Sequence, residues 1–230
     1  MGNLIAKIVP LAIGGAVSPI LVISVVLLLS GTRKPRARAL AFAVGNVVAL
    51  ALVAVAVLLL FHSVGHTGTG STRAGKLIDL TLGVLLTAMG VGKLIEFISK
   101  KLSHQPEVAT SDDEADQPAP SKGGVLGSLV LGVGLMATNI TTIALYLSAM
   151  KDVAEAKVGN GDRIIVSAIA VVIIMVPVAV PLLITVIVPG TSTKVLAAVR
   201  TFITRYRDLI MGIFVTGFGV YLALKGARSL

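Results

Sequence analysis

The sequence contains no cysteine and little charge. The absence of cysteine excludes disulfide bonds, thiolate metal sites and thiol redox chemistry. Only 13% of the 230 residues are charged, whereas a soluble domain would carry about 25%. Hydrophobic residues make up 55% of the chain, and they occur in runs of roughly 18 residues or more, which are typical of membrane-spanning helices. The sequence therefore predicts an all-α integral membrane protein.

Several kinds of reactive site are also missing. The sequence has no nucleotide-binding loop, no set of nucleophile, histidine and acid, and no carboxylate deep within an apolar run that would carry protons. His62 and His66 have the spacing of metal ligands, but no third ligand is near them. We therefore expect no enzymatic activity, no metal site and no cofactor.

The net charge of +9 raises the question of a nucleic-acid partner. The basic residues lie beside the apolar runs, where anionic lipid headgroups are the expected partner. Membrane lipids are therefore predicted partners, and nucleic acid is not.

Six apolar stretches are long enough to span a bilayer. They cover residues 5–29, 38–61, 76–98, 124–149, 164–188 and 208–225. Residues 100–122 are acidic and rich in proline, which predicts a flexible linker between a first half, 1–99, and a second half, 123–230. A basic amphipathic pattern near 193–206 predicts an interfacial helix before the last span. A positively charged loop is the alternative for that segment.

One motif occurs in both halves. Residues 79–90 read DLTLGVLLTAMG, and residues 208–219 read DLIMGIFVTGFG. Their shared aspartate, glycine, threonine and glycine recur at i, i+4, i+8 and i+11, which places them on one helix face. The matching pairs are Asp79 and Asp208, Gly83 and Gly212, Thr87 and Thr216, and Gly90 and Gly219.

The duplication predicts the architecture. Three spans in each half is an odd number, so the halves must run in opposite senses as a 3+3 inverted repeat, with the site near the midplane. Close backbone packing is the favoured role of the small residues in the motif. Asp79 and Asp208 are expected to stabilise helix N-termini or to pair with nearby Arg or Lys, and charged gates at the two mouths are the alternative role.

The distribution of lysine and arginine predicts the topology. Connections one, three and five carry 11 of these residues, and the opposite side carries 8. Since basic loops stay in the cytoplasm, both termini are expected outside.

Two helix-breaking sequences at matching places in the halves predict the substrate site. The candidate residues are Gly14, Gly15, Ser18 and Pro19 in the first span, and Thr138, Asn139 and Thr142 in the fourth. Proline removes a backbone hydrogen bond, and in lipid the freed polar groups need partners. We expect the two breaks to face each other across the interface between the halves. A tolerated kink, with hydroxyls bonded to their own helix, is the alternative.

Three further residues are candidates. Asn46 is expected to face the bundle, where its amide either binds substrate or joins helices. Pro177 and Pro181 predict a kink or a break in the fifth span, with a hinge as the functional interpretation and a static bend as the alternative.

The segment PLAIGGAVSPILVISVVLLLSGTRKPRARALAFAVGN, residues 10–46, resembles the start of the peptidoglycolipid addressing protein (GAP) family. This family, also called the sulfolipid-addressing (Sap) family, belongs to the lysine-exporter (LysE) superfamily. The resemblance lies in the small residues before Ser18-Pro19, the basic turn 31–38 and the stretch from Phe42 to Asn46, and the six-span layout agrees over the whole length. It implies a transporter in the cytoplasmic membrane of a bacterium that moves a glycolipid or another lipid-linked envelope component.

Two other functions stay open. The wider superfamily includes exporters of amino acids and cations, but this chain has GGAVSP in place of their Pro-Gly-Pro, which favours the lipid-associated branch. The other alternative is that the chain is an accessory scaffold of a larger lipid-export machine. A homodimer or such a complex is the predicted assembly.

Overall fold

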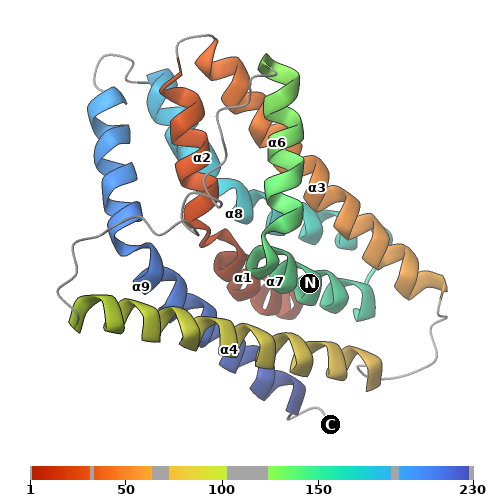
Figure 1. Cartoon of the computed structure of the whole chain (residues 1–230). Coiled ribbons are helices and arrows are strands. Elements are labelled where there is room, and N and C mark those ends of the chain that lie inside the picture. The colour runs from red at the N-terminus through yellow and green to blue at the C-terminus, as the bar shows by residue number, and fades with distance from the viewer. Residues whose placement is uncertain (1, 32–33, 64–72, 103–123, 188–191, 228–230) are drawn as a thin grey trace.

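The computed structural model describes residues 2–31, 34–63, 73–102, 124–187 and 192–227. Helices dominate this part of the chain (Figure 1), as the composition predicts. They are α1 (Gly2–Ala16), α2 (Pro19–Leu29), α3 (Pro35–Ser63), α4 (Arg73–Leu102), α6 (Gly124–Thr138), α7 (Ile140–Glu155), α8 (Asn160–Ile187) and α9 (Ser192–Ala227). Most of the predicted linker, residues 103–122, and His66 lie outside the described residues.

The helices account for most of the predicted spans. Three segments are long and apolar enough to cross a membrane alone: Pro35–Leu60, Asp79–Ser99 and Asn160–Ile187. Two bent pairs, α1 with α2 and α6 with α7, raise the number of candidate spans to five. The predicted sixth span matches the shorter apolar segment Leu209–Lys225 of α9. The chain is a membrane protein, and the count of six spans stays a prediction.

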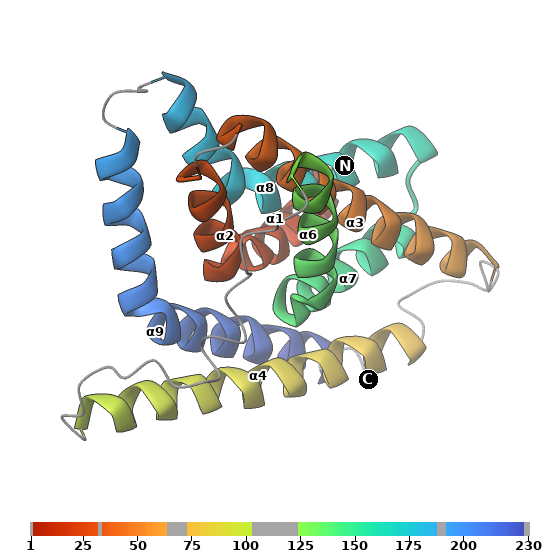
Figure 2. The ribbon, with the colours of Figure 1, turned by 45° about the horizontal axis from the view of Figure 1, so that its top comes forward.

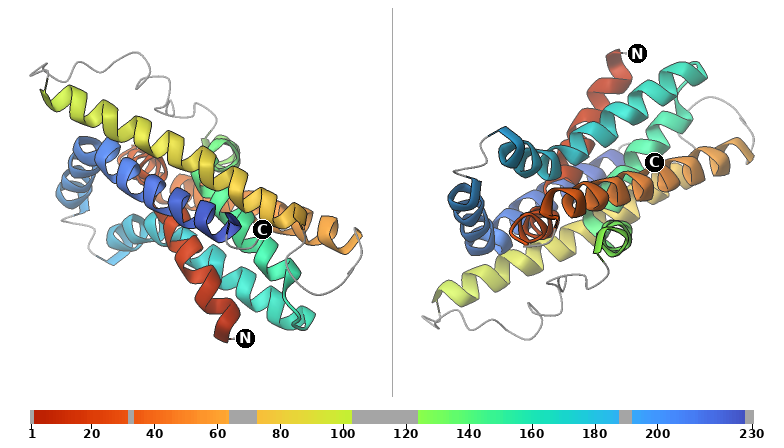
Figure 3. Two further views of the ribbon diagram at one scale, coloured as in Figure 1. Left: turned by 90° about the horizontal axis from the view of Figure 1, so that it is seen from below. Right: turned by 90° about the horizontal axis from the view of Figure 1, so that it is seen from above.

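The predicted interfacial helix near 193–206 and the last span are joined in a single helix, α9. Figure 2 shows that α9 turns along its length, so that its C-terminal part lies beside α4. The two views from below and above show the same neighbours (Figure 3). The sequence predicted two elements here, an interfacial helix and a membrane span. In the structure they form one helix that changes direction along its length (Figure 2).

Glycines set the closest helix contacts in the rest of the bundle. α3 packs on α6, and α1 packs on α7 and α8. A Cβ atom at Gly45 would collide with the backbone at Leu129, and one at Gly132 would collide with the backbone of Phe42. The absence of both side chains therefore lets α3 and α6 approach at backbone distance.

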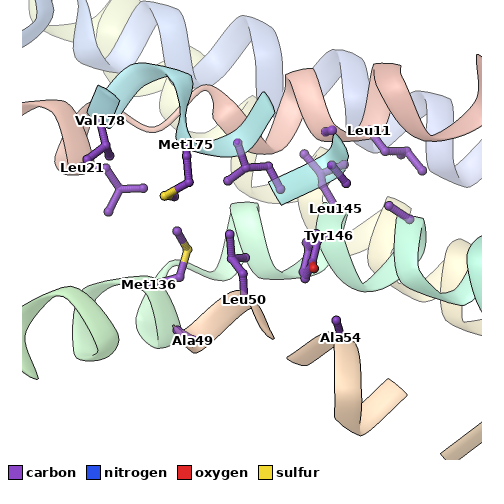
Figure 4. Packing of buried hydrophobic residues seen from close by; sticks show 14 of the residues in the cluster. Leu11, Leu21, Ala49, Leu50, Ala54, Met136, Leu145, Tyr146, Met175 and Val178 are labelled. Carbon is purple, nitrogen blue, oxygen red and sulfur yellow. The ribbon is translucent and has the colours of Figure 1, made fainter. Parts of the chain in front are cut away.

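The interior is apolar, and so is much of the outer surface. Figure 4 shows Leu50, Met136 and Tyr146 packed among buried side chains of neighbouring helices. Large apolar side chains also face outward, among them Leu52 on α3 and Ile187 on α8. Exposed apolar faces of this extent fit a lipid environment, in which they need no protein cover.

Candidate functional site at two helix breaks

The first helix break lies between α1 and α2, which meet at an angle of 56°. Ser18 has extended backbone angles, φ −132° and ψ 96°, and Pro19 is the first residue of α2. Proline suits that position because the first helical residue needs no intrahelical N–H bond. The predicted disruption at Ser18-Pro19 is therefore a full break, and the Ser18 side chain is buried within it.

The second break lies between α6 and α7, which meet at 73°. Asn139 is the N-cap of α7, and its Oδ1 accepts a hydrogen bond from the Thr142 backbone N–H at 3.3 Å. An N-cap asparagine satisfies one of the free N–H groups at a helix start. The sequence Thr138-Asn139 thus ends one helix and begins the next at the predicted place.

The two breaks meet in the interior. The Nδ2 of Asn139 donates to the Oγ of Ser18 at 2.7 Å. One turn along α7, the Oγ1 of Thr142 donates to the backbone carbonyl of Gly15 at 2.8 Å. The expected meeting of Ser18 with Asn139 is confirmed, and the role of these residues in binding substrate stays a prediction. We call the four residues Gly15, Ser18, Asn139 and Thr142 the junction.

Thr138 and Gly14 do not take part in the junction in the expected way. Thr138 is exposed, and its hydroxyl donates to the carbonyl of Gly134 in its own helix at 2.9 Å. The prediction that Thr138 faces Ser18-Pro19 together with Asn139 is wrong, because Thr138 is the last residue of α6 and its side chain is exposed, whereas the chain changes direction at Asn139. Gly14 is buried, but it makes room for Phe218 of α9, whose ring carbons would lie 2.8 Å from a Cβ at that position.

Asn46 faces the bundle, as predicted, and is fully buried. Its Nδ2 donates to the carbonyl of Phe42 in the preceding turn at 2.9 Å. Its Oδ1 is buried and has no hydrogen-bond partner among the described residues. An unpaired amide oxygen in the interior is costly, and Asn46 lines neither of the two grooves described below.

The prolines of α8 do not break the helix. α8 runs without interruption from Asn160 to Ile187 through Pro177 and Pro181. The Oγ1 of Thr185 donates to the carbonyl of Pro181 at 2.9 Å. Figure 2 shows that α8 changes direction along its length, so the prolines are accommodated by a bend, and their role as a hinge stays a prediction.

The duplicated motif lies in the contact between α4 and α9. Cβ atoms at Gly90 and Gly219 would collide with the backbones of Thr216 and Thr87, respectively. A Cβ at Gly83 would meet Ala223, and one at Gly212 would lie 2.6 Å from the Cγ of Leu94. The contacts are reciprocal, since each threonine of one copy meets the last glycine of the other. The two helices therefore pack in antiparallel directions through the matching residues.

Asp79 has a buried, charged environment that the sequence revealed only in part. α4 begins at Arg73, so Asp79 lies beyond the first turn, and its interpretation as a helix N-terminal anion is wrong. Its side chain is 3% exposed and accepts a hydrogen bond from Ser148 at 2.7 Å. The buried ammonium of Lys151 contacts the same carboxylate, and Lys225 lies 3.2 Å from it. The expected pairing of Asp79 with a basic residue is confirmed. The side chain of Asp208 lies outside the described residues.

A second carboxylate completes this cluster. Asp152 contacts Lys225 through both oxygens, at 2.9 and 2.7 Å, and lies 3.7 Å from Lys151. We call Asp79, Lys151, Asp152 and Lys225 the charge cluster. The sequence interpretation ended the fourth span at 149 and placed Lys151 in a loop, but α7 continues to Glu155. The buried residues Val153 and Ala154 continue the apolar face of α7 and are the signal that would have extended the helix.

Two shallow apolar grooves lie on the outside of α9. One, of about 250 Å³, separates α9 from α1 and is lined by Pro10, Ile213, Phe214, Gly217, Phe218 and Tyr221. The other, of about 570 Å³, follows the seam of α4 and α9 and includes Val84 and Leu224. The first groove approaches the junction, because Phe218 in its wall contacts Gly14, one turn before Ser18.

Comparison with known families gives one match. The family described as "Sap, sulfolipid-1-addressing protein" matches residues 8–228 of the chain. No curated protein and no solved structure shows a significant match.

Proposed function

Since the chain belongs to the sulfolipid-1-addressing protein (Sap) family, we propose that it is a transporter that moves a glycolipid or another lipid-linked envelope component across the cytoplasmic membrane of a bacterium. The observation that carries the proposal is the meeting of two broken helices at Ser18 and Asn139. Broken helices at membrane depth supply polar backbone groups to a binding site.

The same proposal includes a 3+3 inverted repeat. The reciprocal contacts of Gly90 with Thr216 and of Gly219 with Thr87 support an antiparallel relation of the halves. The packing of α1 and α6, the first helices of the two broken spans, also supports this relation. α1 of the first half packs on α8 of the second half, and α6 of the second half packs on α3 of the first. In this arrangement the junction lies between the halves, where a relative movement would expose it to either side of the membrane.

The apolar groove between α1 and α9 favours a lipid over a small polar solute. It is lined almost entirely by apolar residues, and its wall at Phe218 adjoins α1 one turn from the junction. An acyl chain fits such a surface, while a headgroup would hydrogen-bond to Asn139 or Ser18. Export of an amino acid or a cation is the second candidate, and a scaffold without transport is the third.

The test is transport by the purified protein in liposomes. A fluorescent sulfated glycolipid, a fluorescent neutral phospholipid and a radiolabelled amino acid are compared, with dithionite quenching to report the leaflet of each lipid. We expect movement of the glycolipid and none of the amino acid. Amino-acid movement alone would support the solute exporter, and no movement of any probe would support the scaffold.

Asn139→Leu should abolish glycolipid movement, because it removes the amide that joins the two breaks. Asn139→Ser keeps an acceptor for the N-cap of α7 but is too short to donate to Ser18, so it separates loss of the junction from loss of the helix start. Thr138→Val, at the exposed neighbouring position, is the matched control and should transport at the parental rate. A stable Asn139→Leu protein with parental transport would place the substrate elsewhere.

A further inference from the structure

Phe218 of α9 lines the apolar groove between α1 and α9, and its ring also contacts Gly14, the residue before Gly15 of the junction. We propose that the Phe218 side chain is a gate. It rotates off Gly14 to let a lipid headgroup pass from the groove to the junction, while the acyl chain stays in the groove. This inference rests on the proposed function, since it names the residue that controls access to the transport site.

The Phe218 ring lies with its face over Gly14. Three neighbouring ring carbons, Cδ2, Cε2 and Cζ, would each lie 2.8 Å from a Cβ atom at Gly14. An atom at the edge of the ring would be nearer to the middle carbon than to its two neighbours, so equal distances place the Cβ over the face. Carbon atoms in contact are about 3.5–4.0 Å apart. The ring can therefore occupy this position because residue 14 has no side chain.

Gly14 belongs to the last turn of α1, which leads directly into the junction. Its carbonyl accepts a hydrogen bond from the Val17 backbone N–H at 3.2 Å. The next carbonyl, that of Gly15, accepts the Thr142 hydroxyl at 2.8 Å. At Phe218 the groove is therefore one residue of α1 away from the first polar group of the junction.

The backbone of α9 is fixed beside the ring, whereas the ring has space to move. A Cβ at Gly219 would collide with the backbone of Thr87, so this part of α9 packs on α4 at backbone distance. Gly217, on the other side of Phe218, is exposed, and a Cβ there would meet nothing within 4 Å. The groove that Gly217 lines has a volume of about 250 Å³. The mobile part is therefore the Phe218 side chain, which can change rotamer into this space.

The lining of the groove determines which molecule the gate admits. None of its lining residues is charged, so the groove offers dispersion contacts to an acyl chain and no charged partner to a headgroup. The hydrogen-bonding groups for a headgroup are those of Ser18 and Asn139, which bond to each other at 2.7 Å. A lipid whose chain lies in the groove reaches these groups when the Phe218 ring leaves Gly14.

The chain has no tryptophan, so one introduced indole reports the position of the side chain at residue 218. The Phe218→Trp protein is placed in vesicles of phosphatidylcholine with brominated acyl chains, and quenching of the indole fluorescence measures contact with those chains. Adding Gly14→Ala should increase the quenching, because the new Cβ displaces the ring toward the groove. Phe214→Trp, which lines the same groove one turn earlier, is the control. Its quenching should be the same with and without Gly14→Ala.

The liposome transport assay tests the gate through selectivity. Phe218→Ala removes the ring, so the neutral phospholipid that the closed gate holds back should move together with the glycolipid. Gly217→Leu fills the groove beside the ring and should abolish glycolipid movement. It should not lower stability, because its Cβ has open space and leucine favours a helix more than glycine does. Ala88→Leu fills the groove along α4 and α9 and should move glycolipid at the parental rate.

Gly14→Ala alone is the second test of selectivity if Phe218→Ala folds poorly. It keeps the ring and moves it off α1, so phospholipid movement should rise in this variant too. Three results would each overturn the proposal: quenching at residue 218 that ignores Gly14→Ala, parental selectivity in both ring variants, or parental glycolipid movement in Gly217→Leu.

The two measurements separate this inference from the transport proposal. Quenching that responds to Gly14→Ala in a protein that moves no lipid would reject the transport proposal and still support a movable ring. Glycolipid movement with unresponsive quenching and parental selectivity would keep the transporter and reject the gate.

Discussion

Two glycines of α4, Gly90 and Gly92, differ in how much space a side chain would have at their positions. A Cβ at Gly90 would collide with the backbone of Thr216, whereas one at Gly92 would meet nothing within 4 Å. We expect Gly90→Leu to lower the free energy of unfolding by about 1–3 kcal/mol or more, as overpacking does, and Gly92→Leu to leave it nearly unchanged. The midpoint of thermal unfolding in detergent checks this. Equal midpoints for the two variants would contradict the packing of α4 against α9.

At the residue scale, sequence reasoning succeeded where chemistry forces a partner. Proline at 19 and asparagine at 139 both break a helix in an apolar run, and the meeting of Ser18 with Asn139 follows from the need to pair polar groups in lipid. Thr138 could not be placed, because its orientation depends on the residue at which α6 ends. The burial of Lys151 and its pairing with Asp79 were not predicted. A lysine just after an apolar run looks the same in the sequence whether it lies in an exposed loop or in a buried ion pair.

Among elements, the register of α4 against α9 gives a sharp prediction. Val84 and Leu224 are exposed and line one groove along the seam. Val84→Cys with Leu224→Cys should therefore be joined by a short bifunctional thiol reagent, as a mobility shift on a denaturing gel would show. Val84→Cys with Ile213→Cys is the matched control, since these positions correspond in the two copies of the motif. A link in the control pair alone would mean that the helices run parallel.

Helix existence could be predicted from the apolar runs, but helix continuity could not. The sequence predicted a separate helix before the last span, whereas α9 is continuous. It predicted a kink or a break at Pro177 and Pro181, and α8 bends there without breaking (Figure 2). The Thr185 hydroxyl bonds to the carbonyl of Pro181, and tertiary packing outweighs local propensity. By contrast, both true breaks have a capping or N1 residue in the sequence, namely Asn139 and Pro19.

For the whole molecule, the prediction concerns topology. The excess of basic residues in connections one, three and five predicts that the linker lies in the cytoplasm and that both termini lie outside. Ala115→Cys and Arg228→Cys should therefore differ in intact spheroplasts, with an impermeant maleimide labelling position 228 and sparing 115. Lysed membranes, in which both cysteines react, are the control. Labelling of position 115 alone before lysis would reverse the topology.

The reciprocal contact of Thr87 with Gly219 and of Thr216 with Gly90 has a consequence for the history of the chain. Two copies of one short polypeptide, inserted in opposite orientations, would form the same isologous contact about a two-fold axis. Such a homodimer must carry identical side chains at corresponding positions. Six residues beyond each copy of the motif, this chain has Glu96 at the position that corresponds to Lys225, and only Lys225 belongs to the charge cluster. Because both copies of the motif belong to one chain, these corresponding positions can carry opposite charges, and the two ends of the bundle differ accordingly.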